Sequence, residues 1–267
     1  MTISATSNIN SGGKTFPGPV TFSGTSTITL VTNSWTITGL LTMTGTTTLN
    51  WTTAETLSCA GITMNNACNQ TAKIIITEGT WSGGSKLSNN TDIQGNVTLS
   101  GTIFWGAASA TLKYVSGTVT TTSSTLSLSQ SVAFTLDTNG ISFNNVTTGQ
   151  SSTITISSLL TVTGTLSLAM TGGSVTFAGT SGWTAGTLTA NNTTARTVTL
   201  VNGVTYTITT GMDCKTSQIS SILLFTSDHA ANTAALILGR GATCNVLADF
   251  TRIDATGGRP IITFNGV

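Results

Sequence analysis

Eight carboxylates are the side chains of this sequence best suited to acid–base chemistry: Glu55, Glu78, Asp92, Asp137, Asp213, Asp228, Asp249 and Asp254. Two carboxylates about 5 to 9 Å apart can together hydrolyse a glycosidic bond. Glu55 and Glu78 would be neighbours if successive turns of the chain stacked one strand spacing, about 5 Å, apart. Eight acids in 267 residues are a small supply, and turns also use aspartate. The sequence therefore favours a protein that is not an enzyme, with glycan hydrolysis as an alternative.

Ser227, Asp228 and His229 are the residue types of a nucleophilic triad, and they stand side by side. Nucleophilic hydrolases of the common kind place the serine in a Gly-x-Ser-x-Gly turn, which this sequence lacks. His229 is also the only histidine. We therefore interpret Asp228 and His229 as loop residues.

Cys59, Cys68, Cys214 and Cys244 could in principle bind a metal. They form no Cys-x-x-Cys pair and have no histidine close in sequence, which a zinc site would need. We interpret them as small buried residues, with a Cys59–Cys68 disulfide as the alternative. No phosphate-binding loop, dinucleotide fingerprint or calcium loop occurs either. The sequence predicts no metal and no cofactor.

Asp249, Arg252, Asp254 and Arg259 form the only mixed-charge cluster of the chain. Such a cluster is typical of ion pairs that close the end of a fold or join two subunits. Contact with a receptor or a glycan is the alternative. These four residues are our candidate oligomer or tip contacts.

Five tryptophans are spread along the chain: Trp35, Trp51, Trp81, Trp105 and Trp183. A tryptophan can stack on a sugar ring, but packing in a core or an interface is the more general use of its large apolar surface. We expect core or interface packing.

Alternation with a period of two is the dominant pattern of the sequence. Runs such as Thr153-Ile-Thr-Ile156 and Thr197-Val-Thr-Leu200 place an apolar residue at every second position. This is typical of strands with one buried face and one face covered by hydroxyl groups. Threonine, which supplies 61 of the 267 residues, suits such strands because its branched Cβ favours the extended chain. Short strands are expected from end to end.

Imperfect internal sequence repeats, which we call echoes, indicate how these strands are arranged. Val20-Thr-Phe-Ser-Gly-Thr25 recurs from Val97 and again from Val175, at offsets of 77 (20 to 97) and 78 (97 to 175). Leu40-Leu-Thr-Met-Thr-Gly-Thr46 recurs from Leu159, at an offset of 119 (40 to 159). No fixed short period emerges. We predict an all-β parallel β-solenoid with irregular rungs of about 15–20 residues. A threonine-rich β-sandwich or barrel is the alternative.

Charge divides the chain unevenly. Residues 138–195 contain no Asp, Glu, Lys or Arg, whereas the chain from Arg196 onward carries nine of the seventeen charges. We predict an N-terminal cap or attachment segment at 1–19, a solenoid shaft at 20–190 and a more charged β region or tip at 191–267. An uncharged shaft has little protection against edge-to-edge association, so we expect sister chains to cover it. The net charge of +1 argues against nucleic acid as a partner, and no apolar segment is long enough to insert in a membrane.

Thr-x-Thr triplets suggest one further activity. Ice-binding β-solenoids present such triplets once per coil on a flat face. The triplets that begin at Thr27, Thr36 and Thr42 follow one another at spacings of 9 (27 to 36) and 6 (36 to 42). Since these spacings differ from a coil length, they argue against an aligned row.

The run Thr197-Val-Thr-Leu-Val-Asn-Gly-Val-Thr-Tyr-Thr-Ile208 and the ending from Thr251 to Gly266 resemble the Thr/Gly-rich β-solenoid proteins of bacteriophage virions. The resemblance implies a non-enzymatic structural protein: an oligomeric spike, fibre, or capsid or tail decoration, commonly a homotrimer. It also implies other virion proteins as partners and contact with a host surface glycan. The N-terminus lacks the features of a secretory signal, which fits synthesis in a host cytoplasm and location in the virion. A bacterial surface adhesin is the alternative.

Overall fold

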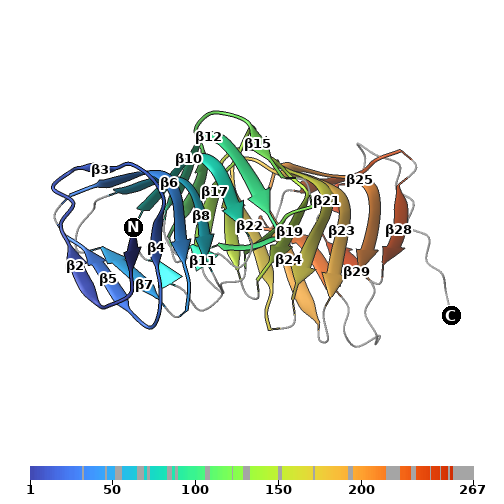
Figure 1. Ribbon diagram of the computed structural model, residues 1–267. Helices are drawn as coiled ribbons and strands as arrows, with labels where there is room; N and C mark the ends of the chain where they lie inside the picture. Colours follow the sequence, from blue (N-terminus) through green and yellow to red (C-terminus); the bar gives the residue numbers. More distant parts are fainter. Residues whose placement is uncertain are drawn as a thin grey trace. The chain divides into compact units, whose positions relative to one another are not determined.

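The computed structural model describes residues 1–267 except 32, 46, 52–55, 65–68, 71–72, 83–85, 88–89, 106–108, 122, 129–132, 150–151, 171, 192–194, 215–222, 230–232, 241, 247, 252 and 255–267. The chain divides into two compact units, Met1–Ser127 and Leu128–Val267. In each unit parallel strands follow one another in stacked coils (Figure 1). The fold is therefore an all-β parallel β-solenoid, as the sequence predicted.

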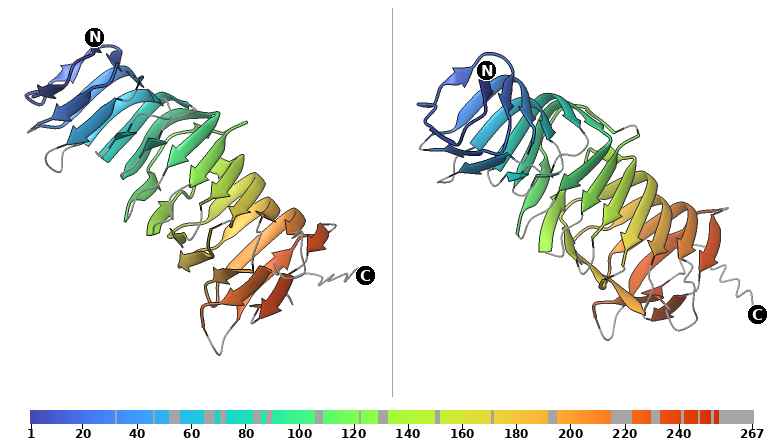
Figure 2. Two further views of the ribbon diagram at one scale, coloured as in Figure 1. Left: turned by 90° about the horizontal axis from the view of Figure 1, so that it is seen from below. Right: turned by 60° about the horizontal axis from the view of Figure 1, so that its bottom comes forward.

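Unit 1 contains three sheets. Its long sheet has the order β1 (Thr2–Ile3), β4 (Val20–Phe22), β6 (Trp35–Met43), β8 (Thr56–Met64), β10 (Lys73–Ser82), β12 (Thr91–Ser100) and β14 (Thr111–Tyr114), with β3 (Thr15–Phe16) beside β6 and β15 (Val119–Thr120) beside β12. What we name the side sheet consists of β2 (Ser7–Ile9), β5 (Thr27–Leu30), β7 (Thr48–Trp51) and β9 (Asn69–Gln70). The third sheet consists of β11 (Lys86–Leu87), β13 (Thr102–Trp105) and β16 (Thr125–Leu128). Figure 2 shows the strands of this unit in succession from two further sides.

Unit 2 is built from two sets of parallel strands. The first set is β17 (Ala133–Asp137), β20 (Thr153–Ile156), β22 (Val175–Gly179), β24 (Arg196–Leu200), β26 (Leu223–Ser227) and β29 (Ala248–Thr251). The second set is β19 (Asn145–Thr148), β21 (Leu160–Ala169), β23 (Trp183–Asn191), β25 (Thr205–Cys214), β27 (Ala234–Leu238) and β30 (Ile253–Asp254), with β18 (Ser142–Phe143) beside β21 and β28 (Thr243–Val246) beside β25. No helix occurs in the residues that the structure describes, so they include no helical segment that could cross a membrane.

The core consists of several columns of apolar side chains, and each coil adds one residue to a column. In unit 1, Val20, Leu41 and Ile62 lie opposite one another in successive strands and are fully buried. The threonines between such residues point outward and are half-buried or exposed. Because a strand alternates its side chains between two faces, the period-two pattern places the hydrocarbon inside and the hydroxyl groups outside.

The register gives the length of each coil. Val20 pairs with Leu41 and Leu41 with Ile62, at an offset of 21 each time (20 to 41 and 41 to 62). Later coils are less regular: Leu57 and its partner Ile74 have an offset of 17 (57 to 74), and Thr197 and its partner Leu224 have an offset of 27 (197 to 224). Several coils are therefore longer than the sequence predicted. The side sheet keeps the offset of 21 throughout (7 to 28, 27 to 48 and 48 to 69), whereas the long sheet departs from it, with 19 between Thr2 and Thr21 and 22 between Trp35 and Leu57.

Glycines allow the first coils to stack closely at one corner. Gly24 and Gly45 follow β4 and β6, and both have a positive φ, +85° and +70°. A Cβ on Gly45 would lie 2.3 Å from the carbonyl oxygen of Gly24. Only glycine combines this backbone conformation with so close an approach.

Candidate functional site

The predicted charged cluster is distributed over two sheets. Asp249 lies in β29, opposite Leu224 of β26. Asp254 lies in β30, opposite Ala235 of β27, in the other set of strands. Arg252 and Arg259 lie outside the described residues. The structure thus places the two aspartates on different strands of unit 2, and their role as oligomer or tip contacts stays a prediction.

Of the two candidate glycosidase carboxylates, one can be placed. Glu78 lies in β10 with its backbone opposite Asn96 of β12. Glu55 lies outside the described residues, so the spacing of the pair stays a prediction. In the described residues, no group of three or more His, Cys, Asp or Glu side chains could hold a metal ion.

Asp228 supports a turn. Its Oδ1 accepts a hydrogen bond from the backbone N–H of Asn202 at 2.7 Å, and its own N–H donates to the carbonyl oxygen of Leu200 at 2.9 Å. Ser227 is 2% exposed, and its Oγ accepts from the backbone N–H of His229 at 3.4 Å. A buried hydroxyl that accepts a local backbone bond is not an accessible nucleophile, which confirms the interpretation of Asp228 and His229 as loop residues.

Four of the five tryptophans are buried: Trp35, Trp81, Trp105 and Trp183. Trp183 packs against Phe177 and Tyr206, with ring centroids 5.9 and 5.3 Å away. Nothing is described of the Trp51 side chain. The prediction that the tryptophans serve in packing is confirmed for the four that are described, and none of these four offers an open ring face to a sugar.

The described cysteine side chains are also core residues. Cys59 and Cys214 are fully buried thiols, and burial raises the pKa of Cys59 from its ordinary 9.0 to about 12. Such a thiol stays protonated and inert near neutral pH. Cys68 lies outside the described residues, and Cys244 is placed by its backbone alone, opposite Met212.

Threonine ladders are the main feature of the outer surface, and threonines of the Thr-x-Thr triplets belong to different ladders. Thr27 lies in the side sheet, whereas Thr36 and Thr42 lie at two places along β6 of the long sheet. The spacings between the triplets therefore measure distances around one coil. These three triplets do not align with one another, as the sequence predicted, and each has other partners one coil away.

These partners are in register. Thr27 lies opposite Thr48 in the side sheet, and Thr36 lies opposite Thr15. The longest described row of unit 1 runs through Thr2, Thr21, Thr42 and Thr63 of the long sheet. Paired threonines on neighbouring strands each stabilise a sheet by about 0.2–1 kcal/mol, so the ladders contribute to the fold as well as to the surface.

Unit 2 carries equivalent ladders. Thr153, Thr176 and Thr199 face one another across β20, β22 and β24, and Thr226 of β26, the next residue in register, is buried. In the other set of strands, Ser142, Thr161, Thr184 and Thr207 form a row in β18, β21, β23 and β25. Hydroxyl groups repeated at the strand spacing thus cover both sets of strands.

No family model, curated protein or solved structure matches this chain.

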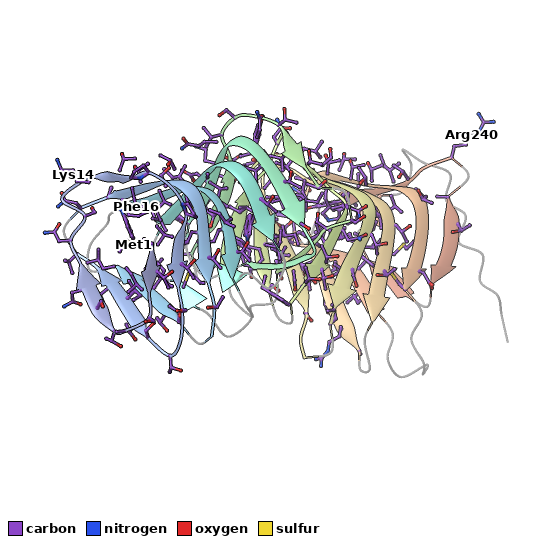
Figure 3. The ribbon with its side chains drawn as sticks, viewed as in Figure 1. Met1, Lys14, Phe16 and Arg240 are labelled. Atoms are coloured by element: carbon purple, nitrogen blue, oxygen red, sulfur yellow. The ribbon has the colours of Figure 1, made fainter. Side chains whose placement is uncertain are left out.

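The surface chemistry of the ladders is uniform. A threonine hydroxyl can donate one hydrogen bond and accept two, and its methyl group lies beside it. Lys14 after β2 and Arg240 after β27 are exposed cations on loops (Figure 3). Lys113 is an exposed cation within β14, opposite Asp92 and outside the threonine rows. The ladders therefore offer repeated, neutral hydrogen-bonding sites, which suit contact with another regular surface.

The sequence reasoning missed Thr6 and Thr48, the partners of Thr27. The signal was present, since Thr6, Thr27 and Thr48 follow one another at a constant offset of 21 (6 to 27 and 27 to 48). With 61 threonines in the chain, however, many other spacings occur equally often. Only the register selects the one that matters.

Proposed function

We propose that this chain is a non-enzymatic structural protein of a bacteriophage virion, in which sister chains associate through their hydroxyl-covered strand faces into a spike, fibre or surface decoration. A homotrimer is the expected assembly, held in the virion by other virion proteins and able to contact the host surface.

The observation that supports this proposal most is that the charge-free stretch 138–195 forms neighbouring strands of unit 2. It supplies β18, β19, β20, β21, β22 and β23 of unit 2, and the outward residues of these strands include Thr153, Thr161, Thr176 and Thr184. Sheets that stay apart in solution usually carry charged side chains where they could meet another sheet. Faces that lack them are suited to permanent contact with a second chain.

The same architecture provides mechanical resistance. Within each unit, consecutive strands pair in parallel along the stack, so the backbone hydrogen bonds of one coil continue into the next. Repeat architectures of this kind gain stability from each interface between neighbouring coils. Pulling on such a unit loads many hydrogen bonds together, which fits a protein that transmits force at a particle surface.

Size-exclusion chromatography with light scattering, followed by negative-stain imaging of the same peak, tests the assembly. We expect a particle of about 82 kDa, three times the chain mass of 27.2 kDa. Substitution of an outward threonine by lysine on each of two faces, Thr176→Lys and Thr184→Lys, is expected to dissociate the particle in at least one case, because like charges would meet at the interface. Circular dichroism checks that both variants keep their strands.

A wild-type monomer with the 27.2 kDa of a single chain would overturn the oligomeric proposal, and so would two folded variants that both remain trimeric. The virion assignment has its own test. Antibodies against the purified protein should label the surface of phage particles from the source culture, whereas labelling of the bacterial cell envelope in their place would support the adhesin alternative.

A further inference from the structure

The side sheet of unit 1 has the most regular outer face among the described residues. Thr27 and Thr29 of β5 are its outward residues, with Ile28 between them fully buried. Thr48 of β7 lies opposite Thr27, and Asn8 of β2 lies opposite Thr29. On the other side of Thr27 stands Thr6, whose Oγ1 accepts a hydrogen bond from the backbone N–H of Thr27 at 3.3 Å.

This face is a regular two-dimensional array, which we call the lattice, and each outward side chain of it is one cell. The pairings of β2, β5 and β7 all have the same offset of 21 (7 to 28 and 27 to 48), with no register shift along them. Outward positions repeat about every 4.8 Å from strand to strand and about every 6.6 Å along a strand. Figure 1 shows β2, β5 and β7 side by side as one layer.

The row on the long sheet is less suited to a flat ligand. Its threonines Thr21 and Thr42 have their next outward neighbours at Ser23 and Thr44, which lie beyond the ends of β4 and β6. The chain turns there, at Gly24 and Gly45. Leu40, which is 39% exposed, stands beside the row. The pairing of β6 with β8 also contains a register shift. In β5, by contrast, both outward positions, Thr27 and Thr29, lie within the strand.

The chemistry of the side-sheet face indicates what it can bind. Its described residues, Thr6, Asn8, Thr27, Thr29 and Thr48, are neutral and can both donate and accept hydrogen bonds. None of these five is aromatic, so the face lacks the ring platforms on which proteins commonly stack sugars. A small molecule would occupy only one cell of the lattice. A ligand that itself repeats every few ångströms could bind all cells at once.

From this we propose that the side sheet of unit 1 binds ice, with the hydroxyl and amide groups hydrogen-bonding to the water lattice and the threonine methyl groups filling the spaces between them. Every cell adds a weak contact, and the rigid backbone ladder holds the cells in place before binding. Little conformational entropy is lost on binding as a result. This activity does not depend on the virion assignment, and its face lies on β2, β5 and β7 of unit 1, whereas the association proposed above is argued from strands of unit 2.

Ice-affinity partitioning tests the proposal. A dilute solution of the full chain and an inert globular reference protein is frozen slowly on a cold surface, and the protein in the ice fraction is compared with that in the remaining liquid. We expect the wild-type chain to be enriched in ice several-fold over the reference protein. Thr29→Lys places a long charged side chain in the centre of the lattice and should reduce the enrichment to the level of the reference.

Thr36→Lys is the matched control. Thr36 also begins an outward Thr-x-Thr triplet and is exposed, but it lies in β6 on the long sheet, so this variant should keep the wild-type enrichment. Circular dichroism and the melting temperature of both variants establish that they are folded. Wild-type protein that is not enriched in ice would overturn the proposal, and equal losses in the two folded variants would overturn its assignment to the side sheet. Light scattering of the same samples shows separately whether the assembly persists.

Discussion

The first coils of unit 1 and the coils of unit 2 solve the same stacking problem in different ways. In unit 1, Ile28 pairs with Leu49 at an offset of 21 (28 to 49), and Val20 pairs with Leu41 at the same offset (20 to 41). In unit 2, Tyr206 pairs with Leu236 at an offset of 30 (206 to 236). The inward positions are nevertheless buried in both units. Burial therefore fixes the register of the strands and leaves the length of the corners free.

One corner in each unit is held in a different way. In unit 1, Gly24 and Gly45 stack backbone on backbone, which requires successive coils to turn at the same place. In unit 2, the turn that contains Gly203 is held by side chains from outside it: Asp228 accepts the N–H of Asn202, and the Tyr206 hydroxyl accepts the N–H of Val201 at 3.0 Å. Backbone stacking is not confined to unit 1, since a Cβ on Gly179 of unit 2 would also lie 2.4 Å from the carbonyl oxygen of Ile156. The difference in support therefore belongs to these two corners.

The largest expected effect comes from adding one methyl group to each kind of corner. Gly45 and Gly203 have the same φ of +70°, but a Cβ on Gly45 would lie 2.3 Å from a backbone oxygen, whereas nothing lies within 4 Å of one on Gly203. Gly203→Ala should lower the free energy of unfolding by about 1–2 kcal/mol, because alanine is strained in the left-handed backbone conformation. Gly45→Ala should cost that amount and the displacement of a neighbouring coil, more than about 3 kcal/mol in total.

Urea unfolding monitored by circular dichroism gives the two free energies of unfolding. Because the backbone conformation is matched, their difference isolates the close contact between coils. Equal losses in the two variants would mean that the corner of unit 1 does not depend on backbone stacking.

Alkaline pH should destabilise the protein through one buried group in each unit. Burial raises the pKa of Cys59 in unit 1 from 9.0 to about 12, and burial with a smaller contribution from Asp228 raises that of Tyr206 in unit 2 from 10.0 to about 12. A raised pKa means that the folded protein keeps a proton that the unfolded chain has lost. The resulting stability is fully present below pH 9 for Cys59 and below pH 10 for Tyr206, and it is lost as the pH rises toward 12.

At about 1.4 kcal/mol per pKa unit, the full losses above pH 12 are on the order of 4 kcal/mol for Cys59 and 3 kcal/mol for Tyr206, of which about 3 and about 1 kcal/mol are reached at pH 11. Unfolding in urea at pH 8, 9.5 and 11 measures them. Cys59→Ala should reduce the decline that begins near pH 9, and Tyr206→Phe should reduce only the decline above pH 10. A variant Cys59→Ala that keeps the full decline from pH 9 would show that this thiol is not the group responsible.

The sequence was sufficient to predict the fold and the structural, non-catalytic roles of several residues. Threonines that alternate with apolar residues predict strands with one buried face. Stacking is a stable way to bury the apolar faces of many short strands. The solenoid could therefore be predicted from the composition and the echoes. The echoes themselves were not the structural repeat. Val97 resembles Val20 in its neighbours, yet it pairs with Gly79, whereas Val20 belongs to the column of Leu41 and Ile62.

The threonine lattice could not be derived in the same way, for a physical reason. Outward positions are not constrained by burial, so any threonine there is compatible with the fold, and the sequence has too many of them to reveal a period. The buried residues of the side sheet, Ile28 and Leu49, carry the constant spacing of the first coils, but Ile, Leu, Val and Phe are interchangeable in such columns. Register appears only when the strands are paired.

The smallest expected effect concerns the side-chain support of the corner in unit 2. Asp228→Ala removes the acceptor of the Asn202 N–H, and because the site is exposed, water can replace it, so we expect a loss of about 1 kcal/mol. The pKa of Tyr206 should also fall, since Asp228 contributes to raising it. Asp213→Ala, which removes an exposed aspartate from β25 of the same unit, is the control. Ultraviolet titration of the tyrosines reports the pKa directly, because each phenolate absorbs where the phenol does not. A Tyr206 pKa that moves equally in the two variants would reduce the electrostatic effect of Asp228 on Tyr206 to that of general surface charge, and the hydrogen bond to Asn202 would then be the only specific role of Asp228 at this corner.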